Sequence, residues 1–417
     1  MRTLASLLLA AALASPAAAE TVLIRDGRVV TNTAQGVIEN GDVLIVDNRV
    51  SAVGANLSAP SGARVIDATG KWVTPGVFAA VSQVGLSEIS GSGAPNDGSV
   101  SGDLVSAAAD SARGFNPTVT AIPVTRMEGV TRAAIAASAQ SGIFSGRGAI
   151  VRLDGAPDSV ERANAFLVLR MGDNGAGRTG GSRASYWPVL EAALRDAREY
   201  PGRYRSGQGG AVLNEIDAAA VQPYAQGRGL ILVQVEGARD IRELIRFKRI
   251  NPSLRIAILG AAEGWMVADE IAAANIPVIV DAMANLPNSM DQLGARLDNA
   301  ALLSAAGVRV AIASDGDAHQ ARLTLQMAGN AVANGMDWDD AFAAVTRVPA
   351  EIFGVSGVGT LQRGAVGDVV VWDGDPLQVM SAPTNVFIDG AEQPLTSRQT
   401  MLRDRYHPNR LRERAAR

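Results

Sequence analysis

The sequence predicts an α/β fold: a (β/α)8 TIM-like barrel joined to a small β-sandwich that is built from both chain ends. Three observations lead to this prediction. The middle of the chain alternates apolar β-type runs with amphipathic helical runs, which is typical of a parallel α/β fold. Short strand-like runs precede this region, and similar strand-like runs occur near the C-terminus. Neither end alone has enough strands to close a core, so we expect the two to join.

The composition is that of a folded globular protein. The chain has 417 residues, of which 47% are hydrophobic and 19% are charged, so it can form one large domain with a smaller companion. Its formal net charge of -4 gives no electrostatic basis for binding nucleic acid. The absence of cysteine excludes disulfides, thiol catalysis and Cys-ligated zinc. Beyond the N-terminal stretch, no segment is long and apolar enough to span a membrane.

The N-terminal stretch MRTLASLLLAAALASPAAAE has a basic Arg2, a short apolar run and a small-x-small ending. This pattern predicts a secretory signal peptide over residues 1–19 that is cleaved after Ala19. We therefore expect an exported, periplasmic protein. A buried N-terminal helix or a retained anchor is the alternative, although the run is short for spanning a bilayer.

The expected domains follow from these patterns. The β-sandwich takes residues 20–72 and 356–400, the barrel takes 73–355, and a basic tail takes 401–417. The eight barrel strands are expected at 77–81, 131–137, 148–152, 165–170, 229–234, 254–259, 276–281 and 308–313. Helices are expected at 184–199, 237–249, 263–274, 291–306 and 318–334. The link between the second and third strands is too short for a good helix, so a doubly wound open sheet is the alternative fold.

Two Gly/Ser-rich stretches, 89–102 and 171–185, follow strand ends on the side where barrel enzymes place their active-site loops. Mobile surface loops without chemistry are the alternative. The second stretch contains GAGRTG (175–180), which has the spacing of a dinucleotide-binding loop. That motif also requires an acid at the end of the next strand, whereas Glu199 lies in an expected helix, so we expect a flexible loop.

Four stretches make the sequence similar to a known family: 65–85, 257–280, 307–355 and 359–376. A Pro-Gly before strand one, an Ala-Ser-Asp after strand eight and a closing GDVVVWDGDP occur in that order. By these motifs the chain resembles the amidohydrolase superfamily, nearest the exported group similar to imidazolonepropionases. The resemblance implies a metal-binding (β/α)8 barrel beside a β-sandwich. It also implies hydrolysis of C–N or related bonds with one or two divalent metals, such as zinc.

Most of the metal-ligand positions that the resemblance implies carry other residues here. The family uses a His-x-His on strand one, a carbamylated Lys or Glu on strand four, single histidines on strands five and six, and an Asp after strand eight. Val81 and Gln83 stand in place of the first pair, and Gln234 stands at the strand-five position. Strand four has no lysine, strand six has only Gly and Ala, and Asp315 alone is retained.

The two histidines of the chain do not restore such a site. His407 lies in the C-terminal tail, and His319 opens the helix after strand eight, where it could face the barrel mouth. A zinc site needs three or four good donors, so we expect no metal ligands of the family type and no cofactor.

Polar side chains nevertheless follow the strand ends that would form the barrel mouth. These pocket candidates are Gln83, Gln234, Glu236, Glu263, Asp281 and His319. One hypothesis is an oxygen-rich site for Mg²⁺ or Ca²⁺, and the alternative is that the acids are favoured at helix N-termini by the helix dipole. Another hypothesis makes Asp315 catalytic, paired with His319 as acid and base without metal, and the alternative is that Asp315 shapes its loop through backbone hydrogen bonds.

The leading functional hypothesis is non-hydrolytic. It is a binding protein with a small-molecule ligand in the barrel mouth, or a partner subunit that docks a related amidohydrolase, and a homodimer is also expected from the resemblance. The alternative is a hydrolase of amide, imide or small peptide bonds that uses Asp315 with or without a rebuilt metal site. The basic tail is interpreted as a strap or a solvated surface, with anionic lipid or a partner subunit as alternatives.

Overall fold

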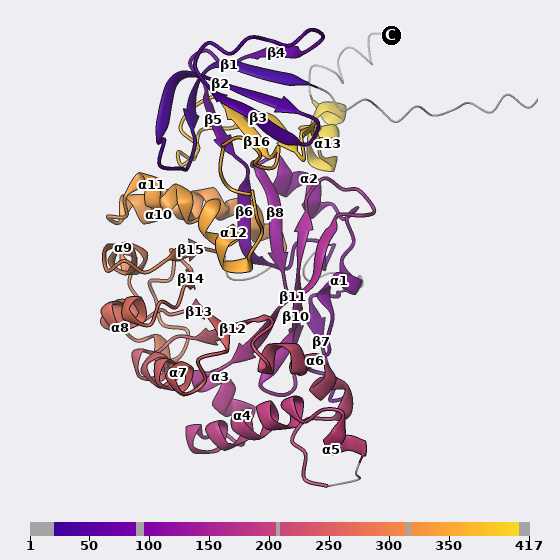
Figure 1. Cartoon of the computed structure of the whole chain (residues 1–417), viewed down its shortest axis with the longest axis vertical. Coiled ribbons are helices and arrows are strands. Elements are labelled where there is room, and N and C mark those ends of the chain that lie inside the picture. The colour runs from indigo at the N-terminus through magenta and orange to yellow at the C-terminus, as the bar shows by residue number, and fades with distance from the viewer. Residues whose placement is uncertain (1–20, 89–95, 206–208, 314–317, 408–417) are drawn as a thin grey trace, which may run out of the picture.

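The computed structural model describes residues 21–88, 96–205, 209–313 and 318–407. The predicted signal peptide, the predicted catalytic Asp315 and residues 408–417 of the predicted tail lie outside the described residues. Two large sheets organise the described chain: a mixed sheet in a β-rich domain, and a sheet that curls into a barrel (Figure 1).

The β-rich domain is one mixed sheet that joins strands from the two ends of the chain. Its strands are β1 (Val22–Val30), β2 (Val37–Val46), β3 (Arg49–Gly54), β4 (Arg64–Asp67), β5 (Trp72–Pro75), β16 (Val369–Trp372), β17 (Pro383–Ile388) and β18 (Ala391–Glu392). β16 pairs antiparallel with β5, so that Val371 lies opposite Val73. Alternating apolar residues such as Ile24, Val43 and Phe387 build its core.

Eight further strands surround the barrel interior in the order of the sequence. They are β6 (Val77–Ser82), β8 (Val130–Ile135), β10 (Phe144–Arg152), β11 (Val160–Arg170), β12 (Leu230–Val235), β13 (Arg255–Gly260), β14 (Val278–Val280) and β15 (Val310–Ile312). Phe78, Ala134, Phe166, Leu232 and Ile279 meet in one buried cluster inside it. The predicted α/β class with a TIM-like barrel is therefore confirmed.

One barrel strand runs against the others, which the prediction of a regular (β/α)8 barrel did not include. β10 pairs antiparallel with both β8 and β11, whereas the other neighbouring pairs in this sheet are parallel. Residues 136–143 join β8 to β10 and are too few for the helical crossover that a parallel connection requires. The N-terminal end of β10 therefore lies at the same end of the barrel as the C-terminal ends of its neighbours.

The barrel closes through a chain segment that follows β15. Ile312 N donates to Ala344 O at 2.9 Å, and Phe78 N donates to Val345 O at 2.8 Å. The backbone of Ala344 and Val345 thus lies between β15 and β6 and satisfies polar groups on both strands.

Helices cover the outside of the barrel (Figure 1). The longer ones are α4 (Arg183–Arg198), α6 (Glu215–Ala225), α7 (Ala238–Ile250) and α10 (Thr324–Ala333). In α7, Ile241, Leu244 and Ile245 are buried while the arginines between them face outward, which is the period of an amphipathic helix. Within the described residues, no helix has both the length and the hydropathy needed to cross a membrane.

The other helical segments are short. They are α1 (Ser111–Gly114), α2 (Ala121–Arg126), α3 (Gly172–Gly177), α5 (Gly202–Arg205), η1 (Gly264–Val267), α8 (Ala268–Ala273), η2 (Met290–Gln292), α9 (Asn299–Ala305), η3 (Ala318–Leu323), α11 (Trp338–Ala343), α12 (Arg347–Phe353) and α13 (Arg398–Tyr406). The stretch 171–185, expected to be a flexible loop, contains α3 and the first turn of α4, where the Ser182 side chain caps the helix by accepting from Ala184 N. In the other Gly/Ser-rich stretch, β7 (Ser99–Val100) pairs with β9 (Ser138–Ala139).

A buried arginine joins the barrel to the β-rich domain. Arg132 on β8 is 2% exposed, and its Nε donates to Asp368 Oδ2 at 2.8 Å. Its other nitrogens pair with Glu161 and Asp389. Burial alone would lower the pKa of Arg132, but the three carboxylates outweigh that effect and raise it.

Candidate functional site

A cavity of about 300 Å³ lies at the end of the barrel where the parallel strands finish. Its walls come from the C-terminal ends of β6, β8 and β11 to β15, together with the N-terminal end of β10. Apolar side chains, including Val81, Val168 and Leu259, form part of the lining, and polar groups lie among them. Cavities that combine apolar side chains with placed polar groups are typical small-molecule sites.

Four of the predicted pocket residues lie around this cavity: Gln83, Gln234, Glu236 and Asp281. The amide of Gln83 is held in place, because its Nε2 donates to Gly98 O at 2.9 Å. Gly98 permits this close approach, since a Cβ there would lie 2.7 Å from Gln83 Oε1. Gln234 is half-buried, and its side chain has no hydrogen-bond partner among the described residues. A ligand in the cavity can therefore meet an amide group that is not committed to the protein.

The two acids of the cavity also support the backbone around it. Glu236 Oε2 accepts from Ala262 N at 3.0 Å, and Asp281 Oδ1 accepts from Met283 N at 2.8 Å. Gly260, with a φ of 103°, leaves room for the Glu236 carboxylate, because a Cβ there would lie 2.4 Å from Glu236 Oε1. Both acids thus hold the turns that follow β13 and β14.

Two other predicted residues lie outside the cavity. Glu263 accepts from Ala238 N at 3.1 Å, at the start of α7, and from Gly294 N at 3.0 Å, so it joins two backbone segments. His319 is exposed and lines a separate cavity of about 560 Å³, beside Arg398 of α13. His319 is thus not among the described residues that line the barrel-mouth cavity.

The structure adds polar residues that the sequence interpretation missed. Ser138 and Ser145 line the cavity, and Arg170 lies behind Ser138, with its Nη2 donating to Ser138 Oγ at 2.9 Å. Ser145 reaches the mouth because β10 is reversed, which the spacing of the strands did not predict. Arg170 ends β11, the fourth strand of the barrel, and pairs with Gln234 of β12.

The donor set of this cavity does not fit a metal centre of histidines and a lysine. Its described lining offers three glutamine amides, one asparagine amide, serine hydroxyls and two carboxylates that accept backbone hydrogen bonds. Neutral amides are poor ligands for zinc. In the described part of the chain, no three His, Asp or Glu side chains come together in a geometry that could hold an ion.

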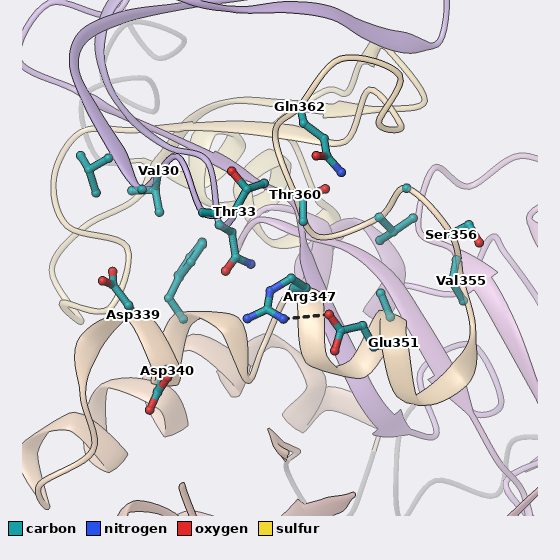
Figure 2. A pocket seen from close by; sticks show the side chains of 18 of the residues that line it. Val30, Thr33, Asp339, Asp340, Arg347, Glu351, Val355, Ser356, Thr360 and Gln362 are labelled. Atoms are coloured by element: carbon teal, nitrogen blue, oxygen red, sulfur yellow. Dashed lines mark hydrogen bonds and ion pairs between the residues drawn. The ribbon is translucent and has the colours of Figure 1, made fainter. Parts of the chain in front are cut away.

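A larger cavity of about 800 Å³ lies between the β-rich domain and helices α11 and α12 (Figure 2). Arg347 and Glu351 face each other across one turn of α12, with Nη1 and Oε1 2.8 Å apart. Thr33 and Gln362 approach from the β-rich domain and the loop that precedes β16. This cavity shares no lining residue with the barrel mouth, and none of the predicted site residues lines it.

Comparisons with known proteins agree with this architecture. The family model described as "Amidohydrolase family" matches residues 253–397. The amidohydrolase tasK of Hapsidospora irregularis is 24% identical over 85% of this chain, and the chain spans 39% of that protein's length. The chain also superposes on the crystal structure of an amidohydrolase from Thermotoga maritima with a TM-score of 0.78 and 23% identity, covering 89% of this chain and 99% of the other. The family model and these relatives support the amidohydrolase superfamily for this chain.

A shorter stretch of the chain is similar to dihydroorotases. The dihydroorotase of Citrifermentans bemidjiense is 48% identical over 14% of this chain and 13% of its own length. The residues matched by the family model include Asp281, but they begin after Gln83 and Gln234. The likeness therefore supports the fold, and the chemistry of the mouth depends on the side chains present there.

Proposed function

We propose that this member of the amidohydrolase superfamily binds a small organic molecule in its barrel mouth and does not carry out the family's metal-dependent hydrolysis. One observation carries the proposal: the cavity presents Val81, Gln83 and Gln234 at the positions that the resemblance assigns to histidine ligands. Amide groups hydrogen-bond a neutral or charged ligand readily and bind zinc poorly. The volume of about 300 Å³ corresponds to about ten water molecules, which suits a small metabolite.

Elemental analysis of the purified full chain, dialysed without chelator, tests this proposal. We expect less than about 0.1 equivalent of zinc, manganese or magnesium, because two backbone-bonded carboxylates and neutral amides cannot retain a transition metal against water. The same protein should stay inactive toward amide, imide and dipeptide substrates when zinc or manganese is added. One equivalent of retained metal, together with metal-dependent turnover, would contradict the proposal.

Hydrolysis is the second candidate function, and membership of the superfamily favours it. In this version Asp315 acts on an amide, imide or small peptide bond, with or without a rebuilt metal site. Turnover that disappears in Asp315→Asn but persists in the exposed control Asp337→Asn would support this candidate and replace the binding role.

The other finer parts of the proposal concern location and partners. The N-terminal sequence pattern supports export to the periplasm, so we expect the mature protein from a periplasmic extract to begin at Glu20. Edman sequencing checks this, and an intact Met1 in that fraction would contradict it. A docking role beside a related amidohydrolase is the other non-hydrolytic function, and co-purification of such a subunit would support it.

A further inference from the structure

The described wall of the barrel-mouth cavity carries negative charge and no positive charge. Glu236 and Asp281 line it, whereas no arginine, lysine or histidine is among its described lining residues. Arg170 lies behind Ser138, whose hydroxyl accepts from Arg170 Nη2, and it does not line the cavity itself. A charged group that enters this cavity therefore meets carboxylates, which attract a cation and repel an anion.

The two carboxylates lie in the same sector of the barrel rim. The Glu236 carboxylate packs against the backbone of Gly260 at the end of β13, because a Cβ on Gly260 would lie 2.4 to 2.6 Å from its carboxyl atoms. β14 runs parallel beside β13 and ends at Val280, directly before Asp281. The two acids thus stand at the ends of neighbouring strands, and their charges act on the same part of the cavity.

Other hydrogen-bond acceptors accompany these acids. Gln83 Nε2 donates to Gly98 O at 2.9 Å, which orients the amide and leaves its Oε1 as an acceptor. A carboxylate has about four acceptor sites, so the single bonds from Ala262 N to Glu236 and from Met283 N to Asp281 do not exhaust either group. The mouth therefore favours a ligand that donates several hydrogen bonds.

A buried hydroxyl on the opposite part of the wall also points to a ligand. Ser145 is 3% exposed and lines the cavity, and its hydroxyl forms no hydrogen bond with another described residue. The side chain of Gln234 lines the cavity in the same condition. Buried polar groups normally have a partner, so the partner of Ser145 must come from the contents of the cavity.

An organic cation fits this cavity better than a metal ion. Within the described residues, no three His, Asp or Glu side chains gather in a geometry that could hold an ion. Val81, Val168 and Leu259 form apolar parts of the wall, which a bare ion would leave uncovered. A primary ammonium group offers three N–H donors, and the apolar body attached to it can cover these side chains.

We infer that the barrel mouth takes a small primary amine in its ammonium form, with the ammonium group on Glu236 and Asp281 and the apolar body against Val81, Val168 and Leu259. This inference rests on the proposed function, because it names the chemical class of the ligand that is bound in the same cavity.

Matched pairs of amines and alcohols test the inference on the full chain. The probes are butylamine and 1-butanol, cyclohexylamine and cyclohexanol, and benzylamine and benzyl alcohol, each measured by titration calorimetry at pH 7. The members of a pair have nearly the same shape, so they isolate the charge. We expect the amine to bind at least about tenfold more tightly than its alcohol in one or more pairs, because charge-assisted hydrogen bonds are about twice as strong as neutral ones.

Salt gives a second measurement on the unaltered protein. Raising the NaCl concentration tenfold should weaken binding of the amine and leave binding of the alcohol unchanged, because salt screens only the charged interaction. MgCl₂ at matched ionic strength should displace the amine no better than NaCl does. Stronger displacement by MgCl₂ would assign the two acids to an inorganic cation and overturn the inference.

Variants of the two acids assign the preference to their charges. Glu236→Gln and Asp281→Asn each remove one charge but keep an oxygen that can accept the backbone hydrogen bond. Each should weaken the preference for the amine, and the double variant should abolish it. Glu263→Gln is the matched control, because Glu263 also accepts from two backbone groups, Ala238 N and Gly294 N, but does not line the cavity. This control should keep the preference in full.

Circular dichroism during heating, without ligand, checks that each variant is folded. If the double variant does not fold, the amine and alcohol pairs, the salt series and the two single variants still decide the question. A preference that is undiminished in both single variants contradicts the inference in the same way as one that survives in the double variant.

The outcomes separate this inference from the proposed function. No preference for an amine in any pair overturns the assignment of an ammonium ligand. Amine binding that depends on the two acids, combined with retained metal and turnover, keeps the assignment and rejects the non-hydrolytic role. Equal binding of amine and alcohol without metal keeps the binding role and rejects the assignment.

Discussion

Arg132→Met is expected to lower the free energy of unfolding by about 3–5 kcal/mol. Methionine fills a similar volume but leaves Asp368, which is 1% exposed, without its charged partner. The carboxylate then keeps a hydrogen bond from Asp389 N at 2.9 Å, which does not balance its charge. Glu161 and Asp389 are about one third exposed, at 34% and 33%, so water can solvate them when the arginine is gone.

Urea denaturation followed by circular dichroism measures this loss. Arg242→Met is the matched control, because Arg242 forms an ion pair with Glu270 in which both side chains are nearly half exposed. Pairs of that kind contribute about 0.2–1 kcal/mol, so the control should change the unfolding free energy little. If the two variants lost equal stability, the buried network would not be what holds the β-rich domain to the barrel.

The second large effect is expected at Asp217, near the start of α6. Its carboxylate is 4% exposed and accepts from Ser106 N at 3.0 Å and from Ala108 N at 2.8 Å. It also accepts from the Ser106 hydroxyl and from the amide of Asn214. Asp217→Ala should lower the free energy of unfolding by about 3 kcal/mol, because it leaves buried donors without the charged acceptor to which they were bonded.

A second aspartate provides the comparison for Asp217→Ala. Asp337 accepts from Asp339 N at the start of α11, but it is exposed, so water can replace it. Asp337→Ala should therefore lower the free energy of unfolding by about 1 kcal/mol, the usual loss when an N-cap residue is replaced by alanine. Hydrogen exchange of residues 104–110 adds a local readout: these amides should exchange faster in Asp217→Ala only. Unchanged exchange would show that the carboxylate does not hold this segment.

The strands of the barrel were predictable because each contains a short apolar run between turn residues. Such a run is typical of a strand in a buried sheet. The direction of β10 was not predictable from its own residues. The residues of Phe144–Arg152 do not indicate in which direction the strand runs in the sheet. Only the short connection 136–143 constrains its direction. Similarly, the runs 263–274 and 291–306 have helical periodicity, but they contain only shorter elements: η1 and α8 in the first, and the end of η2 and α9 in the second.

The site was predictable only where a residue lies at the C-terminal end of its strand or directly after it. Gln83, Gln234, Glu236 and Asp281 reach the cavity for that reason. Arg170 was not predicted, because nothing in the run FLVLRMGD distinguishes a buried arginine from a surface one. Its burial and its incomplete hydrogen bonding appear only when β10 and β11 are side by side.

The mixed sheet also constrains the order in which the protein can be completed during translation. β5 occupies an interior position of that sheet, yet its neighbour β16 is more than two hundred residues further along the chain. While the ribosome makes the barrel, the free side of β5 has no ladder partner, and pairing across such a separation is slow. Removing the chain from residue 369 onward would therefore remove the strands on one side of β5 and leave an interior strand of the sheet without a partner on that side.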